Sequence, residues 1–314
     1  MPEVKVVRIN AKTFQEPLGK LAATMVQQVF REGHAHIAGP FYIREDIATM
    51  LRYAASIYNL LNYLNADERR KGDCYWFVRY GVTAMSLVRS LIDCLYNVTA
   101  ILESPAENGP AYRKSGLRRT LADLEEDLEK YGGQGEWESY LQERRTAVEL
   151  VARASGFTMD EVMVQSMWPT LGRYVGSAQP GGGFTEHQRF LKTFTLLNWR
   201  QYSALSHGAF EAFVGTLGHV PIGAYYLNDF LSHEDEVKVE DSYELFLSTH
   251  VGRSATVLLC LITELQVHCR FEGHNINDRI CKIWEALMPL FEAKDLYQGR
   301  YAERMKENGI VAAA

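Results

Sequence analysis

Cysteine is scarce in this sequence, and the few cysteines follow no recognisable pattern. Five occur in 314 residues, an odd number, and no Cys-x-x-Cys pair is present. This usage indicates neither a disulfide framework nor a zinc knuckle. The N-terminal stretch MPEVKVVRINAKTF also lacks the apolar core of a secretory signal. We therefore expect reduced, mostly buried thiols in a cytoplasmic protein.

The motifs of several enzyme and cofactor classes are also missing. No Gly-x-Ser-x-Gly elbow supports a serine hydrolase, and no Glu-x-x-His pair supports a ferritin-like dimetal bundle. The stretch QPGGGF at 179–184 lacks the Lys-Ser/Thr of a P-loop. Histidines such as His34 and His36 lie close enough to form ligand pairs, but among nine histidines such proximity is more often incidental. We expect no metal and no cofactor.

Basic residues are fewer than acidic ones, 33 against 39, which gives a net charge of -6 at pH 7. This balance argues against broad electrostatic capture of nucleic acid or of an anionic membrane. One local exception is the stretch YRKSGLRR at 112–119, with four positive charges. It is either a solvated loop and helix start, or a segment that holds a phosphate backbone or an acidic partner.

Strand signals are scarce, being limited to VKVVRIN at 4–10 and EVKVE at 236–240. Almost everywhere else the apolar residues recur at helical spacing. The sequence therefore predicts an all-α fold, a single-domain multi-helix bundle over residues 1–314. In chain order, its expected helices cover residues 44–65, 75–102, 185–217, 243–270, 277–291 and 296–308.

Two strongly charged segments, separated by GGQG, predict an antiparallel helical pair at 117–155 that projects from the bundle. Before it, ESPAENGPAYRKSG at 103–116 contains two prolines and two glycines, which predicts a loop. Capping boxes at Thr158 with Glu161 and at Thr185 with Gln188 predict two further helix starts.

The apolar segment at 75–102 is long enough to span a bilayer. It carries Arg79, Arg89 and Asp93, however, and charged groups inside a membrane are costly. We expect a central core helix and no membrane span.

Polar side chains share faces on three of the expected helices. At 100° per residue, Arg89 and Asp93 lie one turn apart and can pair. Their neighbours on the stripe are small and neutral, so the stripe is either solvent-exposed or a buried polar network. On the helix at 243–270, Glu264 and His268 are also one turn apart and can share a proton or orient one another.

In NWRQYSALSHGAF, Tyr202 and Ser206 share a helix face with the aromatic Trp199 and Phe210. Buried hydroxyl groups need hydrogen-bond partners, so this face indicates the wall of a polar cluster. We expect a helical binding or regulatory protein whose interior cluster is a pocket for an unknown small ligand or a structural network. The expected ligand-binding residues are Arg89, Asp93, Tyr202, Ser206, Glu264 and His268.

YSALSHGAF, together with the upstream RSLID, resembles a group of uncharacterised bacterial all-helical proteins with a Tyr-x-x-Leu-Ser helix that ends in His. That resemblance implies an all-helical fold and no activity. More distantly, Arg200 and His207, with six residues between them, resemble the Arg and His pair of HEPN ribonucleases. The resemblance implies RNA as substrate, metal-independent cleavage, Arg200 stabilising phosphate charge, His207 as acid or base, and a homodimer. A toxin or phage-defence ribonuclease is thus the alternative function.

Overall fold

The computed structural model describes residues 9–66, 76–177, 183–194, 203 and 250–310. Within those residues every regular element is a helix, which confirms the all-α prediction. Most of the first expected strand, and all of the second, lie outside the described residues.

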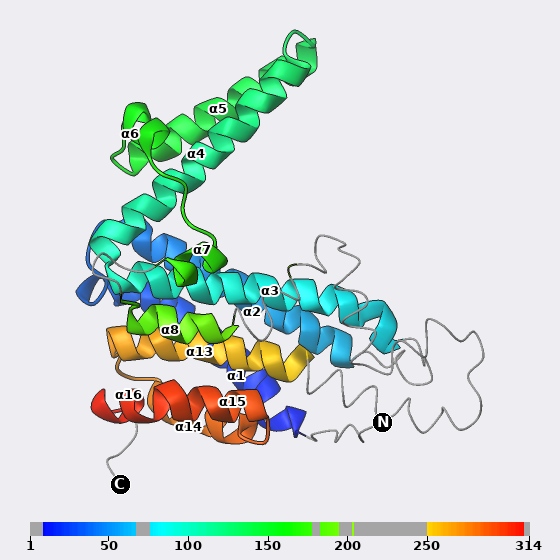
Figure 1. Ribbon diagram of the computed structural model, residues 1–314, viewed down its shortest axis with the longest axis vertical. Coiled ribbons are helices and arrows are strands. Elements are labelled where there is room, and N and C mark those ends of the chain that lie inside the picture. Colours follow the sequence, from blue (N-terminus) through cyan, green and yellow to red (C-terminus); the bar gives the residue numbers. More distant parts are fainter. Residues whose placement is uncertain (1–8, 67–75, 178–182, 195–202, 204–249, 311–314) are drawn as a thin grey trace, which may run out of the picture.

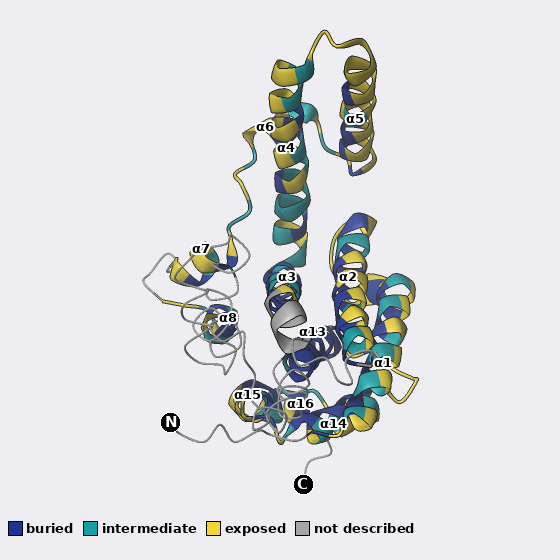
Figure 2. Cartoon of the chain, turned by 90° about the vertical axis from the view of Figure 1, so that its right-hand side faces the viewer, coloured by how far each residue is buried: buried dark blue, intermediate teal, exposed yellow. Residues whose placement is uncertain are grey.

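Three long helices form the centre of the molecule (Figure 1). They are α2 (Phe41–Ala66), α3 (Trp76–Glu103) and α13 (Gly252–Cys269), and each packs against the other two. Almost every residue of α13 is buried, because apolar and small side chains surround the whole helix. Figure 2 shows the same burial as dark blue on α13 and α3. The predicted long central helices are therefore present where the chain is described.

α1 (Ala11–Arg31) covers α2 and α14 with one apolar face. The Asn10 side chain caps it by accepting a hydrogen bond from the Lys12 amide at 3.1 Å. The helices expected from the sequence leave out residues 11–31, so α1 was not predicted. Burial of its apolar side chains, including Phe14 and Leu18 at full burial, holds the helix in place.

α4 (Pro105–Tyr131) and α5 (Gly135–Ala154) form a long antiparallel pair that extends away from the bundle as an arm (Figure 1). The loop predicted at 103–116 is wrong, since α4 already begins at Pro105. Proline suits the first turn of a helix, where its missing N–H has no intrahelical acceptor. Gly109 is buried against Ile43 of α2, so this glycine serves close packing and not a turn.

The arm has a small hydrophobic core of its own. α6 (Met159–Val164) closes it by packing against both long helices. The predicted capping box of α6 is confirmed: the Glu161 amide donates to Thr158 Oγ1 at 3.2 Å, and the Thr158 amide donates to Glu161 Oε2 at 2.7 Å. The buried core residues of the arm are Leu121, Leu124, Leu141, Val148, Ala152 and Val162.

α7 (Leu171–Gly176) and α8 (Glu186–Phe194) return the chain to the bundle, where α8 packs on α3. The second capping box is confirmed as well. The Gln188 amide donates to Thr185 Oγ1 at 3.1 Å, and the Thr185 amide donates to Gln188 Oε1 at 2.9 Å. Of the predicted continuation of this helix to residue 217, only Ser203 is described, and it is helical.

The C-terminal helices are α14 (Ile276–Leu287), α15 (Phe291–Leu296) and α16 (Ala302–Glu307), with a π-helical turn at Tyr297–Tyr301 between the last two. α14 and α15 both pack against α13. A π-turn inserts one extra residue per turn and so changes the direction in which its side chains project. Here it places Arg300 toward α13 and α8.

Among the described residues, one helical stretch, Thr83–Glu103, is long and apolar enough to cross a membrane. Some 67% of its apolar window is buried inside the protein, as is typical of a core helix. This burial agrees with the expectation of a core helix.

Candidate functional site

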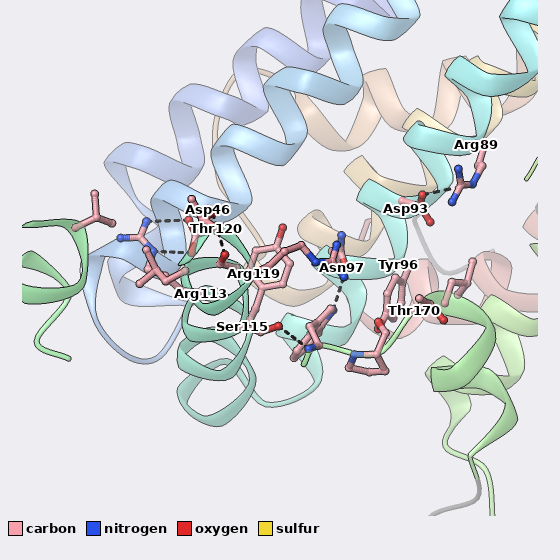
Figure 3. Close-up of a pocket in the computed structure, with 17 residues that line it drawn as sticks. Asp46, Arg89, Asp93, Tyr96, Asn97, Arg113, Ser115, Arg119, Thr120 and Thr170 are labelled. Atoms are coloured by element: carbon pink, nitrogen blue, oxygen red, sulfur yellow. Dashed lines mark hydrogen bonds and ion pairs between the residues drawn. The ribbon is translucent and has the colours of Figure 1, made fainter. Parts of the chain in front are cut away.

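A cleft of about 560 Å³ opens where the arm joins the bundle (Figure 3). α3 forms one side, the first half of α4 forms another, and the segment Trp168–Leu171 forms the third. The cleft is large enough for a small-molecule ligand, since such sites occupy roughly 300–1,000 Å³. The described residues therefore contain a concave site at the base of the arm.

The polar stripe of α3 faces this cleft. Arg89 Nε lies 3.9 Å from Asp93 Oδ2, and 25% and 35% of the two side chains remain exposed. Asn97, one turn further along, lines the same cleft. The stripe is therefore neither a fully solvated face nor a sealed network, and it forms the polar side of an open cleft.

Aromatic side chains from α3, α4 and the connecting segment form another wall of the cleft. Trp168 Nε1 donates to Asn97 Oδ1 at 3.0 Å, and its backbone amide donates to Ser115 Oγ at 2.5 Å. Tyr96 donates its hydroxyl hydrogen to the Pro169 carbonyl at 2.7 Å, and the Tyr112 ring meets Trp168 edge-on at 5.5 Å. These bonds fix the wall, because each joins a helix to the connecting segment.

Arg113 lines the cleft and joins the arm to the bundle. Its Nε and Nη2 donate to the two carboxylate oxygens of Asp46 at 3.0 and 2.8 Å. Its Nη1 donates to Ser155 Oγ at 3.0 Å, and its guanidinium covers the Tyr42 ring at 4.6 Å. Paired in this way with a carboxylate, the Arg113 charge is committed to holding α2, α4 and the end of α5 together.

Arg119 differs from the other two arginines of the cleft. It is exposed, and within the described residues no hydrogen bond or ion pair to it is recorded. Arg113 and Arg119 both come from YRKSGLRR, the stretch for which the sequence left a solvated segment or an anion-binding segment open. The aromatic wall carries no such local signal, because Trp168 joins Tyr96 and Tyr112 only through folding.

Glu264 belongs to a separate buried cluster. Its carboxylate accepts from Arg300 Nε at 2.6 Å and Nη2 at 3.0 Å, and from Arg304 Nη1 at 3.0 and 3.1 Å. Arg300 also donates to Glu186 Oε1 at 3.1 Å and lies 3.0 Å from His187 Nδ1. Burial alone would raise the pKa of Glu264, but the two arginine charges outweigh it and hold that pKa at about 2.

Glu264 and His268 were expected to act on one another, yet each has other surroundings. The Glu264 carboxylate is enclosed by arginines, whereas His268 is exposed on the last turn of α13. Neither residue lines the cleft that contains Arg89 and Asp93. Among the described candidates, the structure thus brings Arg89 and Asp93 together at one site and places Glu264 in another.

Burial and the neighbouring Arg300 charge both lower the pKa of His187. Its Nδ1 therefore accepts the Arg300 hydrogen as part of a neutral ring. Because Glu264 and His187 both contact Arg300, this cluster ties α13, α8 and the C-terminal π-turn together.

Arg200, Tyr202, Ser206 and His207 lie outside the described residues, so their roles stay predictions. The ribonuclease alternative has a direct test. If it holds, the purified protein cleaves RNA in the presence of EDTA, and His207→Ala abolishes cleavage because the acid-base group is gone. RNA that stays intact with the wild-type protein on a sequencing gel removes this alternative, and cleavage by the variant moves the site elsewhere.

No cluster of three or more His, Cys, Asp or Glu side chains able to hold a metal ion occurs among the described residues. Comparison with protein-family models, with curated proteins and with solved structures finds no match to this chain. The geometry of the cleft is therefore the basis for a functional proposal.

Proposed function

We propose that this protein is a helical binding or regulatory protein that holds a small anionic ligand in the cleft at the base of the arm. The proposal rests on the position and charge of Arg119. Arg119 lines the cleft of about 560 Å³, and its guanidinium forms no ion pair with a carboxylate of the described residues. A planar, permanently charged donor in such a position suits a carboxylate or phosphate group, which it can bind through two parallel hydrogen bonds.

The charge balance of the cleft supports an anion. Arg113 is paired with Asp46 and Arg89 with Asp93, so Arg119 is the cation in excess. Figure 3 shows the two ion pairs at opposite ends of the cleft, with Asn97 and Tyr96 between them. A ligand that fills the cleft thus meets one excess positive charge and a wall of polar and aromatic groups.

The aromatic wall favours a ligand with a flat or apolar part. Trp168 and Tyr112 lie in the cleft, and both are partly exposed. Rings of this kind contact a flat ligand by stacking or edge-on packing, worth about 0.5–1.5 kcal/mol for each pair.

We place this binding protein in the cytoplasm, where its buried thiols stay reduced.

Fluorine NMR of 5-fluorotryptophan protein tests the proposal, with AMP, adenosine and inorganic phosphate as probes. We expect AMP to shift the Trp168 resonance, which Trp168→Phe identifies, and to leave Trp137 of the distal arm unmoved. Arg119→Ala removes the charged hydrogen bonds and weakens AMP binding roughly tenfold, about 1.4 kcal/mol.

Arg52→Ala is the matched control, because Arg52 is an exposed arginine of α2 outside the cleft. The proposal fails if Arg119→Ala and Arg52→Ala bind AMP alike. It fails too if none of the three probes shifts Trp168.

A further inference from the structure

The free end of the arm exposes aromatic rings. Trp137 and Tyr140 at the start of α5 are each 49% exposed. Trp137 stacks on Tyr131 with ring centres 5.2 Å apart, and it meets Tyr140 edge-on at 6.0 Å. These three rings, here named the aromatic tip, contact one another beside the α4–α5 turn, which is the end of the arm furthest from the bundle (Figure 1).

Acidic side chains surround the aromatic tip. Residues 125–143 contain seven acidic residues and one basic residue. That excess equals the net charge of -6 of the entire chain, so the remainder is balanced. Arg144 and Arg145, which follow, already pair with Asp127 and Glu149. The six exposed acids without an ion pair in the described residues are Glu125, Glu126, Glu129, Glu136, Glu138 and Glu143.

We infer that the aromatic tip and its acidic surround are a docking surface for a basic amphipathic segment of a partner protein. Apolar side chains of that segment cover the rings, and its lysines and arginines pair with the glutamates around them. Aromatic anchors surrounded by a polar rim are common in protein interfaces. Arginine and lysine side chains also bind over tryptophan faces, and within the arm Lys130 and Arg144 already lie over the rings of Tyr131 and Tyr140.

The same charge argues against other occupants. A second aromatic tip carries the same excess of negative charge, so two tips repel each other. RNA, DNA and anionic membranes are repelled for the same reason. A basic polypeptide is the remaining class of partner whose chemistry complements both the rings and the acids.

The arm presents this surface rigidly and apart from the cleft. Its own buried core, which includes Leu124 and Leu141 near the tip, keeps α4 and α5 aligned. The cleft is lined by the first half of α4, several turns from Trp137. The docking surface therefore stands independently of the proposed ligand site.

The full-length protein and a fluorescein-labelled peptide of lysine and leucine with helical spacing test the inference. Anisotropy at physiological salt is expected to show binding of this peptide and none of a matched peptide in which glutamate replaces lysine. Two variants of the tip are expected to lose at least roughly tenfold in affinity. One is Trp137→Ala with Tyr140→Ala, and the other is Glu125→Gln with Glu129→Gln and Glu138→Gln.

Glu285→Gln with Glu303→Gln and Glu307→Gln removes the same charge from exposed positions on α14 and α16 and is expected to bind as the wild type does. Circular dichroism checks that each variant keeps its helices, and Tyr140→Ala alone serves if the double aromatic variant unfolds. The inference is overturned if the basic peptide does not bind, if the control loses as much, or if the aromatic variants bind normally. Light scattering that shows tip-dependent self-association overturns it as well.

Discussion

Glu264→Gln is expected to lower the free energy of unfolding by about 3–5 kcal/mol, because it leaves buried arginine charge without its counterion. Glu264 is 3% exposed, and the side chain of Arg300 is 5% exposed, so neither group can recover its hydration. Glutamine keeps the shape of the side chain and one acceptor oxygen but removes the charge. Arg304, whose side chain is 22% exposed, can turn toward solvent, which leaves the loss concentrated on Arg300.

Glu186→Gln is the matched control. Glu186 binds the same Arg300 at 3.1 Å, but 62% of its side chain is exposed, so its removal is expected to cost less than about 1 kcal/mol. Urea denaturation with equal slopes measures both variants. Equal losses for the two substitutions contradict the view that burial makes the Glu264 ion pair matter. Replacement of both partners by apolar residues, Glu264→Leu with Arg300→Met, is expected to recover much of the loss.

The stability that Glu264 supplies also depends on pH. Its folded pKa of about 2 lies below the pKa of a glutamate in an unfolded chain, about 4.3. A group with a lowered folded pKa stabilises above its unfolded pKa, and the contribution disappears as pH falls through the folded pKa. The difference between wild type and Glu264→Gln is therefore expected to shrink by about 3 kcal/mol between pH 5 and pH 2. Urea titrations at several pH values measure it, and a constant difference contradicts the assignment.

Helix starts and helix periodicity, which depend on residues close in the sequence, could be predicted. The boxes at Thr158 and Thr185 are confirmed because a capping box needs only residues three apart. The helix at 76–103 is recognisable because its apolar side chains recur around a long, buried core segment. The polar stripe of Arg89 and Asp93 follows from the same periodicity, and it does line a cleft.

Long-range packing could not be predicted from the sequence. The carboxylate of Glu264 binds Arg300 and Arg304, which are 36 and 40 residues away in the sequence. No local sequence pattern predicts ion pairs over such separations. One-turn spacing instead suggested His268 as the partner. In the same way the cleft depends on Trp168, which is 71 residues from Asn97 along the chain. Apolar periodicity predicts the class of fold, whereas a binding site depends on contacts between segments that are distant in the sequence.

The start of α4 shows why a pattern of prolines and glycines can mislead, because Gly109 lies inside the helix and packs against Ile43. Gly109→Ala is expected to destabilise the protein by about 1–3 kcal/mol through overpacking. A Cβ atom at Gly109 would lie 2.7 Å from Cδ1 and Cγ1 of Ile43, which is fully buried and stiff at Cβ. Helix propensity alone predicts the opposite sign, since alanine is favoured over glycine by about 0.8–1 kcal/mol within a helix.

Gly116→Ala separates the two effects, because Gly116 lies in the same helix with open space around its Cα. We expect it to stabilise the protein by about 0.5–1 kcal/mol. Ile43→Ala then removes the three atoms nearest to a new Cβ at Gly109, which are Cδ1, Cγ1 and Cγ2 of Ile43. In that background Gly109→Ala is expected to become stabilising, since the methyl group fills space and favours the helix. Chemical denaturation of the four proteins of this cycle measures the change of sign, and additive losses contradict the close approach of α4 to α2.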